Sequence, residues 1–508
     1  MKKLLLAIML TLFTISGLQA EIYDGTVDKK IDWSVDTETG ILKFSSTGNN
    51  NPIPNVEPDT HWKKHKEHIT TVILGDGITK VEAGALNGLN IVSIVIFDNN
   101  KGTGNTSGIP EIDSDNFTDT DVDNITIVVP EDASDSDLDK LAGCLGGESG
   151  SITDKVVTGD PDNITIAKCG ERLNYMLSDN NLKITGNGEM YNYTESTAAP
   201  WGTTVQTIEI GNQVTSIGSY AFKGCTQLQA IELSSAIVNI GDNAFSGCTS
   251  LTTVTLNSNA KIGTDAIPST ATTHFILNDK QQLLLNNNSY NQVSYVRNYN
   301  NTNWQALYLP YEINYEDWSE NFDVARINNV HQYDDNEDGN TDRTTIEIIY
   351  IKSGSIKANT PYFIKAKSSG TITLTVSNKS ISPIDVQNTW CASTTDIYTF
   401  VGTYQGISGE EMINNNYYGM SGGSLISTSN PEYGLSAMRW YLKIESRDDS
   451  QFIRPSRIKI QEIGGTTDIQ DITSDEKKHD TYYDLSGRPV ENPTRGIYIL
   501  NNRKVFIK

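Results

Sequence analysis

Residues 207–267, TIEIGNQVTSIGSYAFKGCTQLQAIELSSAIVNIGDNAFSGCTSLTTVTLNSNAKIGTDAI, carry a repeat with a step of 23 residues. Ile208, Ile231 and Val254 keep this step, and so do Phe222 and Phe245. One coil of this length cannot enclose its own apolar side chains, whereas stacked coils share one continuous core. The step therefore predicts a solenoid of short parallel strands.

Each clean coil contains the pattern I-G-x-x-A-F-x-G-C-x-x-L, which starts at Ile217 and again at Ile240. A step of roughly 20–29 residues with recurring apolar positions is typical of leucine-rich repeats. The pattern resembles the BspA-type leucine-rich repeat of bacterial surface proteins, over two clean coils and a degenerate third. The resemblance implies an adhesion-type role toward an extracellular protein or glycan.

The composition suits a globular protein outside the cell. The chain has 508 residues and a formal net charge of −24, which disfavours binding to nucleic acid. Residues 1–20 predict a signal peptide, with Lys2 and Lys3 before an apolar run and Ala20 at the expected cleavage site. No stretch reaches the ~18 apolar residues of a transmembrane helix. We therefore expect a secreted or outer-cell-surface protein with no transmembrane segment.

The repeat design occurs twice. Residues 21–130 are predicted to hold a first hairpin cap and a degenerate repeat block, because Val72 and Val95 keep the 23-residue step. Residues 131–167 read as a connector with a short helix at 136–142. Residues 168–271 hold the second hairpin cap and the clean repeats. The hairpin strands are expected at 31–35 with 41–44, and at 173–177 with 182–184.

The rest of the chain lacks the repeat. Residues 272–465 show short alternating runs between turn residues, which predict an antiparallel β-sandwich-like domain. Residues 466–480 read as a polar linker. Residues 481–508 resemble the sorting tails of type IX secretion in Bacteroidetes. The expected fold is mainly β, with capped leucine-rich-repeat blocks, a sandwich-like domain and a small C-terminal β tail.

One acidic stretch fits the opening of a calcium loop. Asp334, Asn336, Asp338 and Asp342 occupy ligand positions 1, 3, 5 and 9, but position 12 is Thr345, where a bidentate Glu belongs. Strands rather than helices are expected on both sides, and a β-hairpin turn explains the same residues. The sequence predicts no cofactor, with calcium at this loop as the alternative.

Two further motifs are candidates for a metal site or a catalytic site. His61, His65 and His68 would share one face of a helix and suit zinc, although a solvated surface segment explains them as well. Gly419–Gly423 matches G-x-S-x-G around Ser421, but no helix and no partnering histidine are expected nearby. Paired carboxylates carry no information in a chain with 63 acidic residues. The sequence therefore predicts no catalytic residue and no enzyme.

The cysteines and aromatics also allow two interpretations. Cys225 and Cys248 hold equivalent repeat positions and are expected to pack as buried thiols, with a disulfide as the alternative. Aromatic residues between 290 and 311 are expected in the sandwich core, with a sugar-stacking surface as the alternative. For the whole protein, the alternatives to binding are a polysaccharide-degrading enzyme with its site in 272–465, or a structural protein without a ligand.

Overall fold

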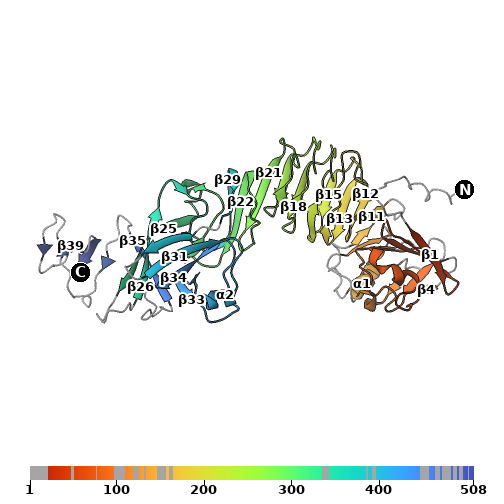
Figure 1. Ribbon diagram of the computed structural model, residues 1–508, viewed down its shortest axis with the longest axis horizontal. Coiled ribbons are helices and arrows are strands. Elements are labelled where there is room, and N and C mark those ends of the chain that lie inside the picture. Colours follow the sequence, from red (N-terminus) through yellow and green to blue (C-terminus); the bar gives the residue numbers. More distant parts are fainter. Residues whose placement is uncertain are drawn as a thin grey trace. The chain divides into compact units, whose positions relative to one another are not determined.

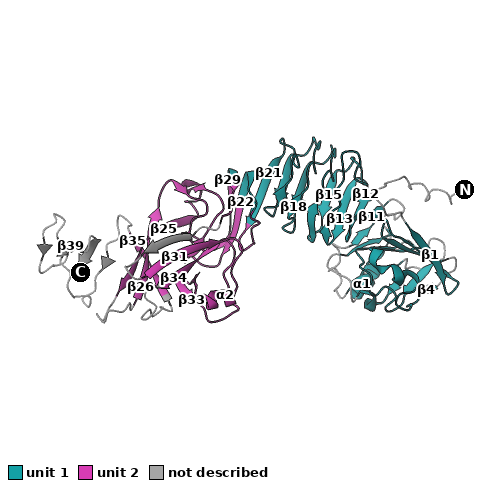
Figure 2. Ribbon diagram, viewed as in Figure 1, with its two compact units in different colours: residues 1–277, 286–294, 377–380 teal, residues 278–285, 295–376, 381–508 magenta. Residues whose placement is uncertain are grey.

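In the computed structural model, β-strands are the main secondary structure of the chain (Figure 1). The described residues are 21–46, 51–75, 77–96, 109–117, 125–130, 133–145, 156–158, 164–333, 343–384, 387–391, 396–446, 457–463, 470–471, 482–483, 489–490, 496–500 and 503–507. They fall into two compact units (Figure 2). The first unit holds 1–277, 286–294 and 377–380, and the second holds 278–285, 295–376 and 381–508.

The first block of unit 1 opens with three antiparallel strands, one more than predicted. They are β1 (Ile22–Val27), β2 (Ile31–Asp36) and β3 (Ile41–Ser46). The sheet continues in parallel through β5 (Thr71–Leu74), β7 (Ser93–Ile96), β9 (Thr126–Val129) and β10 (Val156–Thr158). A smaller sheet joins β4 (Asn51–Ile53), β6 (Ile78–Val81) and β8 (Glu111–Ile112). Strand β10 lies inside the predicted connector, so part of the connector completes the sheet.

The first block encloses its own apolar core. Trp62 is fully buried in the 3₁₀ helix η1 (His61–His68), packs edge-on against Phe44, and donates from Nε1 to Ala85 O at 3.1 Å. A second 3₁₀ helix, η2 (Ser114–Phe117), follows β8. The helix predicted in the connector is present as α1 (Asp135–Cys144). Ser134 caps it by accepting from the Asp137 N–H, while Asp137 accepts from the Ser134 N–H.

The second block repeats the design. Its cap is β11 (Thr165–Gly170), β12 (Leu173–Ser178) and β13 (Asn181–Gly186), and the parallel strands that follow are β15 (Thr207–Ile210), β17 (Ala230–Leu233), β19 (Thr253–Leu256) and β21 (Thr272–Asn278). Strand β15 pairs with β13 of the cap, whereas β17, β19 and β21 form a second sheet that continues through β22 (Asn288–Tyr299) and β29 (Gly370–Ile381). The opposite side is formed by β14 (Gly188–Glu189), β16 (Val214–Ile217), β18 (Asn239–Ile240) and β20 (Lys261–Ile262).

The repeat sheet runs past residue 271, where the sequence placed its end. Strand β21 pairs in parallel with β19, with Leu256 opposite Phe275. The backbone hydrogen-bond register continues there although the 23-residue pattern stops. A sequence repeat marks only those strands whose side chains recur, whereas any strand in register can join a sheet. The repeat pattern therefore predicts too few strands for this sheet.

The repeated side chains stack inside the coils. The rings of Phe222 and Phe245 lie 5.2 Å apart, and both are fully buried. Gly224 and Gly247 each have a φ of +77°, a left-handed conformation that glycine adopts without steric penalty. These glycines turn the chain after each phenylalanine and bring the next coil into register.

Unit 2 is built around one large mixed sheet, in the region where the sequence predicted a sandwich-like domain. One ten-stranded sheet has the order β23-β28-β25-β26-β35-β33-β32-β34-β31-β30. The strands are β23 (Gln305–Leu307), β25 (Phe322–Tyr333), β26 (Arg343–Ile351), β28 (Tyr362–Ala366), β30 (Gln387–Cys391), β31 (Asp396–Thr403), β32 (Tyr418–Ser421), β33 (Ser424–Ser427), β34 (Arg439–Ser446) and β35 (Arg457–Ile463). A two-stranded sheet of β24 (Ile313–Asn314) and β27 (Ser355–Ile356), the 3₁₀ turn η4 (Tyr315–Asp317) and the helix α2 (Gly409–Asn414) complete it.

Both halves of this sheet contribute to one core. Phe363 of β28 and Phe400 of β31 pack edge-on against Trp440 of β34 at 4.8 and 5.3 Å between ring centroids. The sequence predicted an antiparallel domain, but the sheet is mixed, because β26 and β35 pair in parallel. Strand β35 comes after β30–β34 in the chain. The long connection between β26 and β35 therefore allows the two strands to run in the same direction.

The C-terminal residues form a small sheet, as expected for a β tail. Its order is β36-β40-β39-β37-β38, with β36 (Gln470–Asp471), β37 (Tyr482–Tyr483), β38 (Pro489–Val490), β39 (Gly496–Leu500) and β40 (Arg503–Ile507). Strand β36 lies within the predicted linker and pairs with β40. Within the described residues, no helix has both the length and the apolar character needed to cross a membrane.

Candidate functional site

The outer face of the first block's sheet is covered. Ile73, Val95, Val128 and Val157 lie in register on β5, β7, β9 and β10 and point away from the block's own core. They pack in an apolar cluster with Met176 of β12, together with Ile164 and Ile166 near β11. The second cap therefore occupies the face that a repeat sheet would otherwise offer to a partner.

A polar contact fixes this cover beside the apolar cluster. Asn174 is 1% exposed and donates from Nδ2 to Thr71 Oγ1 at 2.6 Å. It also accepts from Thr70 Oγ1 at 2.9 Å. Side chains alternate along β12, so Asn174 and Met176 face the first block while Leu173 and Tyr175 fill the second block's core.

The equivalent face of the second block carries polar side chains. One row consists of Lys183, Glu209, Glu232, Thr255 and His274, on β13, β15, β17, β19 and β21. A parallel row consists of Asn181, Thr207, Ala230, Thr253 and Thr272. All ten are half-buried or exposed. We call these ten positions the open face, and the strands that carry them follow one another in Figure 1.

Most side chains of the open face already have local partners. Lys183 Nζ lies 3.0 Å from Glu209 Oε1, and the Glu209 side chain is 69% exposed. Glu232 accepts from Asn257 Nδ2 at 3.0 Å. His274 Nε2 lies 2.8 Å from Ser294 Oγ. Because Glu232 has an amide partner and no cation within ion-pair distance among the described residues, the middle of the row carries excess negative charge.

The chemistry of the open face favours polar recognition. None of its ten residues is a phenylalanine, tyrosine or tryptophan, the side chains on which sugars usually stack. Its threonines, carboxylates and single lysine provide hydrogen bonds and charge, which are the usual components of the rim of a protein interface. In-register strands also space these groups regularly, by about 4.8 Å from one strand to the next.

The calcium candidates lie outside the described residues. Asp334, Asn336, Asp338 and Asp342 fall between β25 and β26, whose described ends pair as Tyr333 opposite Arg343. The flanking elements are strands, as the sequence predicted. Within the described part of the chain, no three His, Cys, Asp or Glu side chains are grouped so that they could hold a metal ion.

The three histidines do not form a metal site. Helix η1 is a 3₁₀ helix with a kink at His65, so the spacing that aligns residues on an α-helix does not apply. The His65 ring stacks on Tyr23 with 3.9 Å between centroids, and the His61 ring packs near Trp33. Burial lowers the pKa of His65, with a further decrease from neighbouring Lys64. These rings contribute to packing against the first cap.

The remaining motifs have structural explanations. Ser421 ends β32 of a hairpin with β33, and Gly422 and Gly423 form its turn with positive φ, so the sharp strand-to-helix turn of a hydrolase is absent there. Cys225 and Cys248 are buried free thiols, as the packing interpretation predicted. The aromatic residues of 290–311 are buried as well: Tyr290, Tyr295, Tyr299, Trp304, Tyr308 and Tyr311.

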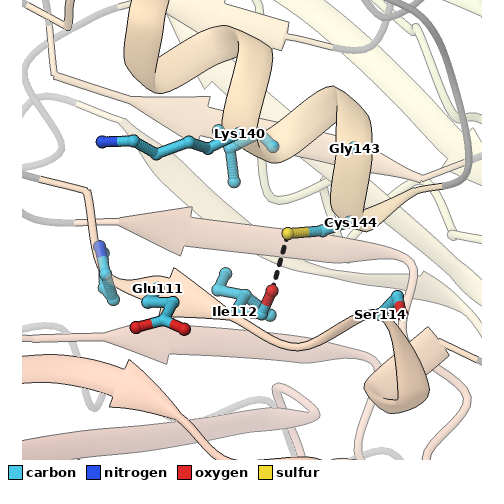
Figure 3. Close-up of a pocket in the computed structure, with 8 residues that line it drawn as sticks. Glu111, Ile112, Ser114, Lys140, Gly143 and Cys144 are labelled. Atoms are coloured by element: carbon cyan, nitrogen blue, oxygen red, sulfur yellow. Dashed lines mark hydrogen bonds between the residues drawn. The ribbon is translucent and has the colours of Figure 1, made fainter.

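Two cavities of unit 1 offer little chemistry. One, of about 320 Å³, lies between α1 and β8, where Cys144 Sγ donates to Ile112 O at 2.6 Å (Figure 3). Its Lys140 and Glu111 are paired with Asp137 and Lys80. The other, of about 440 Å³, borders Lys63, whose Nζ donates to Asn55, Val56 and Gly84. Lys140 and Glu111 of the first cavity and Lys63 of the second therefore have structural partners.

A comparison with known protein families supports the assignment of the repeat to the BspA type. Residues 201–297 match the family described as "BspA type Leucine rich repeat region (6 copies)". The match starts before β15 and ends within β22, so it includes strands beyond residue 271. No curated protein matches the chain.

Two solved structures also match. One is a leucine-rich repeat protein from Eubacterium ventriosum, 18% identical, with 51% of this chain and 79% of that chain covered and a TM-score of 0.17. The other is a leucine rich cell surface protein from Faecalibacterium prausnitzii, 13% identical, with 50% and 90% covered and a TM-score of 0.12.

We did not predict the open face from the sequence, although the alternation of side chains in the repeat indicated it. Glu209 and Glu232 keep the 23-residue step and lie between inward residues such as Ile208 and Ile210. Alternation alone places them on the outer side of the sheet. What the sequence could not supply is the contrast with the first block, since only the docked second cap shows which of the two outer faces is covered.

Proposed function

We propose that this chain is a secreted or cell-surface binding protein whose open face presents a repeat scaffold to a protein partner, in an adhesion-type role. The observation that carries the proposal is the difference between the two blocks. The second cap covers the first block's outer face with Met176 and Asn174, while the second block leaves its ten open-face positions, nine of them polar, accessible.

Three features support binding in preference to catalysis. The repeat gives a rigid, regular surface, which is how solenoid proteins recognise partners. The N-terminal Lys2-Lys3 segment with its apolar run indicates export. The G-x-S-x-G motif and the histidine cluster, which were the best catalytic and metal candidates, have structural roles. The partner is expected to present a basic group, because the Glu232 carboxylate in the middle of the row accepts from an amide and, within the described residues, not from a cation.

The test is binding of the full chain to an array of extracellular matrix proteins, followed by titration of each protein that binds. Charge reversal by Glu232→Lys should weaken binding at least tenfold, about 1.4 kcal/mol. The matched control is Lys261→Glu, a charge reversal at an exposed position of β20 on the opposite sheet. It should leave binding within about twofold, since it lies outside the open face.

Three other outcomes would contradict the proposal. Equal losses in both variants would place the binding surface outside the open face. An array without any protein bound would favour a structural protein that has no ligand. Hydrolysis of polysaccharides by the chain, measured as released reducing sugar, would instead support an enzyme with its site in 272–465.

A further inference from the structure

We propose that the outer edge of strand β1 is a docking site for an extended, basic segment of a partner protein, which joins the sheet of the first block as a further strand. Strand β1 is the terminal strand of the seven-stranded sheet, and within the described residues it pairs with β2 alone. This edge belongs to the first block, whereas the open face belongs to the second. The proposed function therefore does not depend on it.

The backbone groups of β1 point alternately toward β2 and away from it. The Thr37 N–H donates to Glu21 O at 3.2 Å, so Glu21 and every second residue after it turn their backbone groups toward β2. The residues between them, Ile22, Asp24 and Thr26, turn their N–H and C=O groups outward. Among the described residues these outward groups have no backbone partner. We call them the β1 edge, and an added strand requires such a row of donors and acceptors.

The β1 edge lacks the features that usually protect a terminal strand. Its sequence, IYDGTV, contains no proline and no lysine, and its pairing with β2 has no bulge. The corresponding strand of the second cap, β11, has a register shift between Lys168 and Gly170. A bulge of this kind bends a strand and interrupts its pairing. Of the two cap strands, β1 is therefore the one that can accept a further strand along its whole length.

The charge beside the β1 edge determines which segment fits it. Asp24 and Thr26 lie opposite Ser34 and Asp32 of β2, on the outer face of the cap. Both aspartates are exposed, and neither lies within ion-pair distance of a cation among the described residues. Lys43 shares this face but lies on β3, two strands from the edge. An added strand is therefore stabilised by lysine or arginine on its outer face, because opposite charges on neighbouring strands attract.

The other face of β1 offers an aromatic surface. The Trp33 ring lies against Gly25, since a Cβ added to Gly25 would be 2.9 Å from Trp33 Cζ2. Tyr23 lies on the same face of β1, is half-buried, and stacks on His65. An added strand meets these rings with its inner side chains, and apolar residues suit that position. Because side chains alternate along a strand, the segment that fits alternates basic and apolar residues.

A second copy of β1 fits this edge poorly. If two copies paired antiparallel along their whole length, Ile22 would lie opposite Thr26, and Asp24 would lie opposite its own equivalent. Like charges directly opposite each other destabilise a pair of strands. The carboxylate that attracts a basic segment thus also disfavours association of the chain with itself, which is one way in which terminal strands avoid aggregation.

The experiment measures binding of the full chain to a dye-labelled octapeptide of alternating lysine and valine, by fluorescence anisotropy. A peptide with glutamate in place of lysine should bind at least tenfold more weakly. Thr26→Pro removes one outward N–H and should weaken binding of the lysine peptide at least tenfold, because proline cannot donate. Thr26→Val is the matched control, since it keeps the N–H, and it should stay within about threefold.

The two variants separate the backbone contact from other effects. Both lose the hydrogen bond from Thr26 Oγ1 to Asp32, so the difference between them reports on the N–H. Both should fold, because a terminal strand tolerates proline where the N–H points outward. A lysine peptide that does not bind would overturn the proposal, and so would a Thr26→Val variant that loses as much binding as Thr26→Pro.

Hydrogen exchange on the unmodified protein locates the bound peptide. The amides of Ile22, Asp24 and Thr26 should exchange at least tenfold more slowly once the lysine peptide is bound. Those of Tyr23 and Gly25 already face β2 and should change little. Mass spectrometry with electron-transfer fragmentation resolves these neighbouring amides. Protection that appears only outside β1 would place the peptide elsewhere and overturn the proposal too.

Discussion

Asn174 donates from Nδ2 to Thr71 Oγ1 at 2.6 Å, which fastens the cap of the second repeat block to the sheet of the first. Both side chains are almost completely buried. The contact joins residues 103 positions apart in sequence and lies beside the apolar cluster of Val95, Val128 and Met176. The two blocks are thus held to each other by a small, specific interface.

Asn174→Ala should destabilise the protein by about 1–3 kcal/mol, because it leaves the buried hydroxyls of Thr70 and Thr71 without this partner. Urea denaturation followed by circular dichroism measures the change. Asn181→Ala is the control, since Asn181 is exposed on the neighbouring strand β13 and should cost within about 0.5 kcal/mol. A similar loss in both variants would contradict the interface.

The buried ion pair of unit 2 should be sensitive to neutralisation. Asp279 Oδ1 lies 2.7 Å from Arg439 Nη2 and 3.6 Å from Arg297 Nε, and Arg297 is 2% exposed. Asp279→Asn removes the carboxylate that both guanidinium groups face. Breaking a buried pair from one side costs about 3–5 kcal/mol, because the remaining charge stays buried and uncompensated.

Differential scanning calorimetry of Asp279→Asn measures this loss as a lower Tm. Lys357→Ala is the control, because Lys357 pairs with Glu312 at 3.0 Å on the surface, with both side chains well exposed. Exposed pairs contribute about 0–1 kcal/mol. An Asp279→Asn variant as stable as the control would show that the buried pair does not matter for folding.

The repeat thiols should resist alkylation in the native state. Cys169, Cys225 and Cys248 are buried, and burial raises the pKa of the Cys169 thiol well above its ordinary value. Both effects suppress the reactive thiolate. Iodoacetamide and mass spectrometry should therefore find these three unmodified until denaturant is added. Failure of Cys225 and Cys248 to react in denaturant without reductant would instead indicate a disulfide.

Alkaline pH should destabilise the second cap. Burial raises the pKa of Tyr175 to about 12, with a smaller contribution from Cys169, while an unfolded tyrosine keeps a value of about 10. Between these values the unfolded chain binds fewer protons, so stability present below pH 10 falls as pH rises toward 12. Tyr175→Phe should reduce the slope by up to about 1.4 kcal/mol per pH unit. If the free energy of unfolding of Tyr175→Phe depended on pH in the same way as that of the wild type, the prediction would be wrong.

The sequence determined the repeat architecture by itself. A step of 23 residues fixes which side chains stack, because equivalent residues of successive coils must share one core. The hairpins before each block followed from alternation and turn residues, and a short helix was predicted where α1 lies. Such local patterns survive in the structure because they describe each element's own inner and outer sides.

Only the tertiary structure decided which outer face is open. Val95 and Glu232 both lie on outward positions of repeat strands, yet the first is covered and the second is exposed. Tyr441 and Tyr299 are both tyrosines of strands, yet only Tyr441 faces outward. The reason is physical: accessibility depends on what other segments pack against a face. Here Asn174 and Met176 reach the first sheet from about a hundred residues away, and no local pattern records that contact.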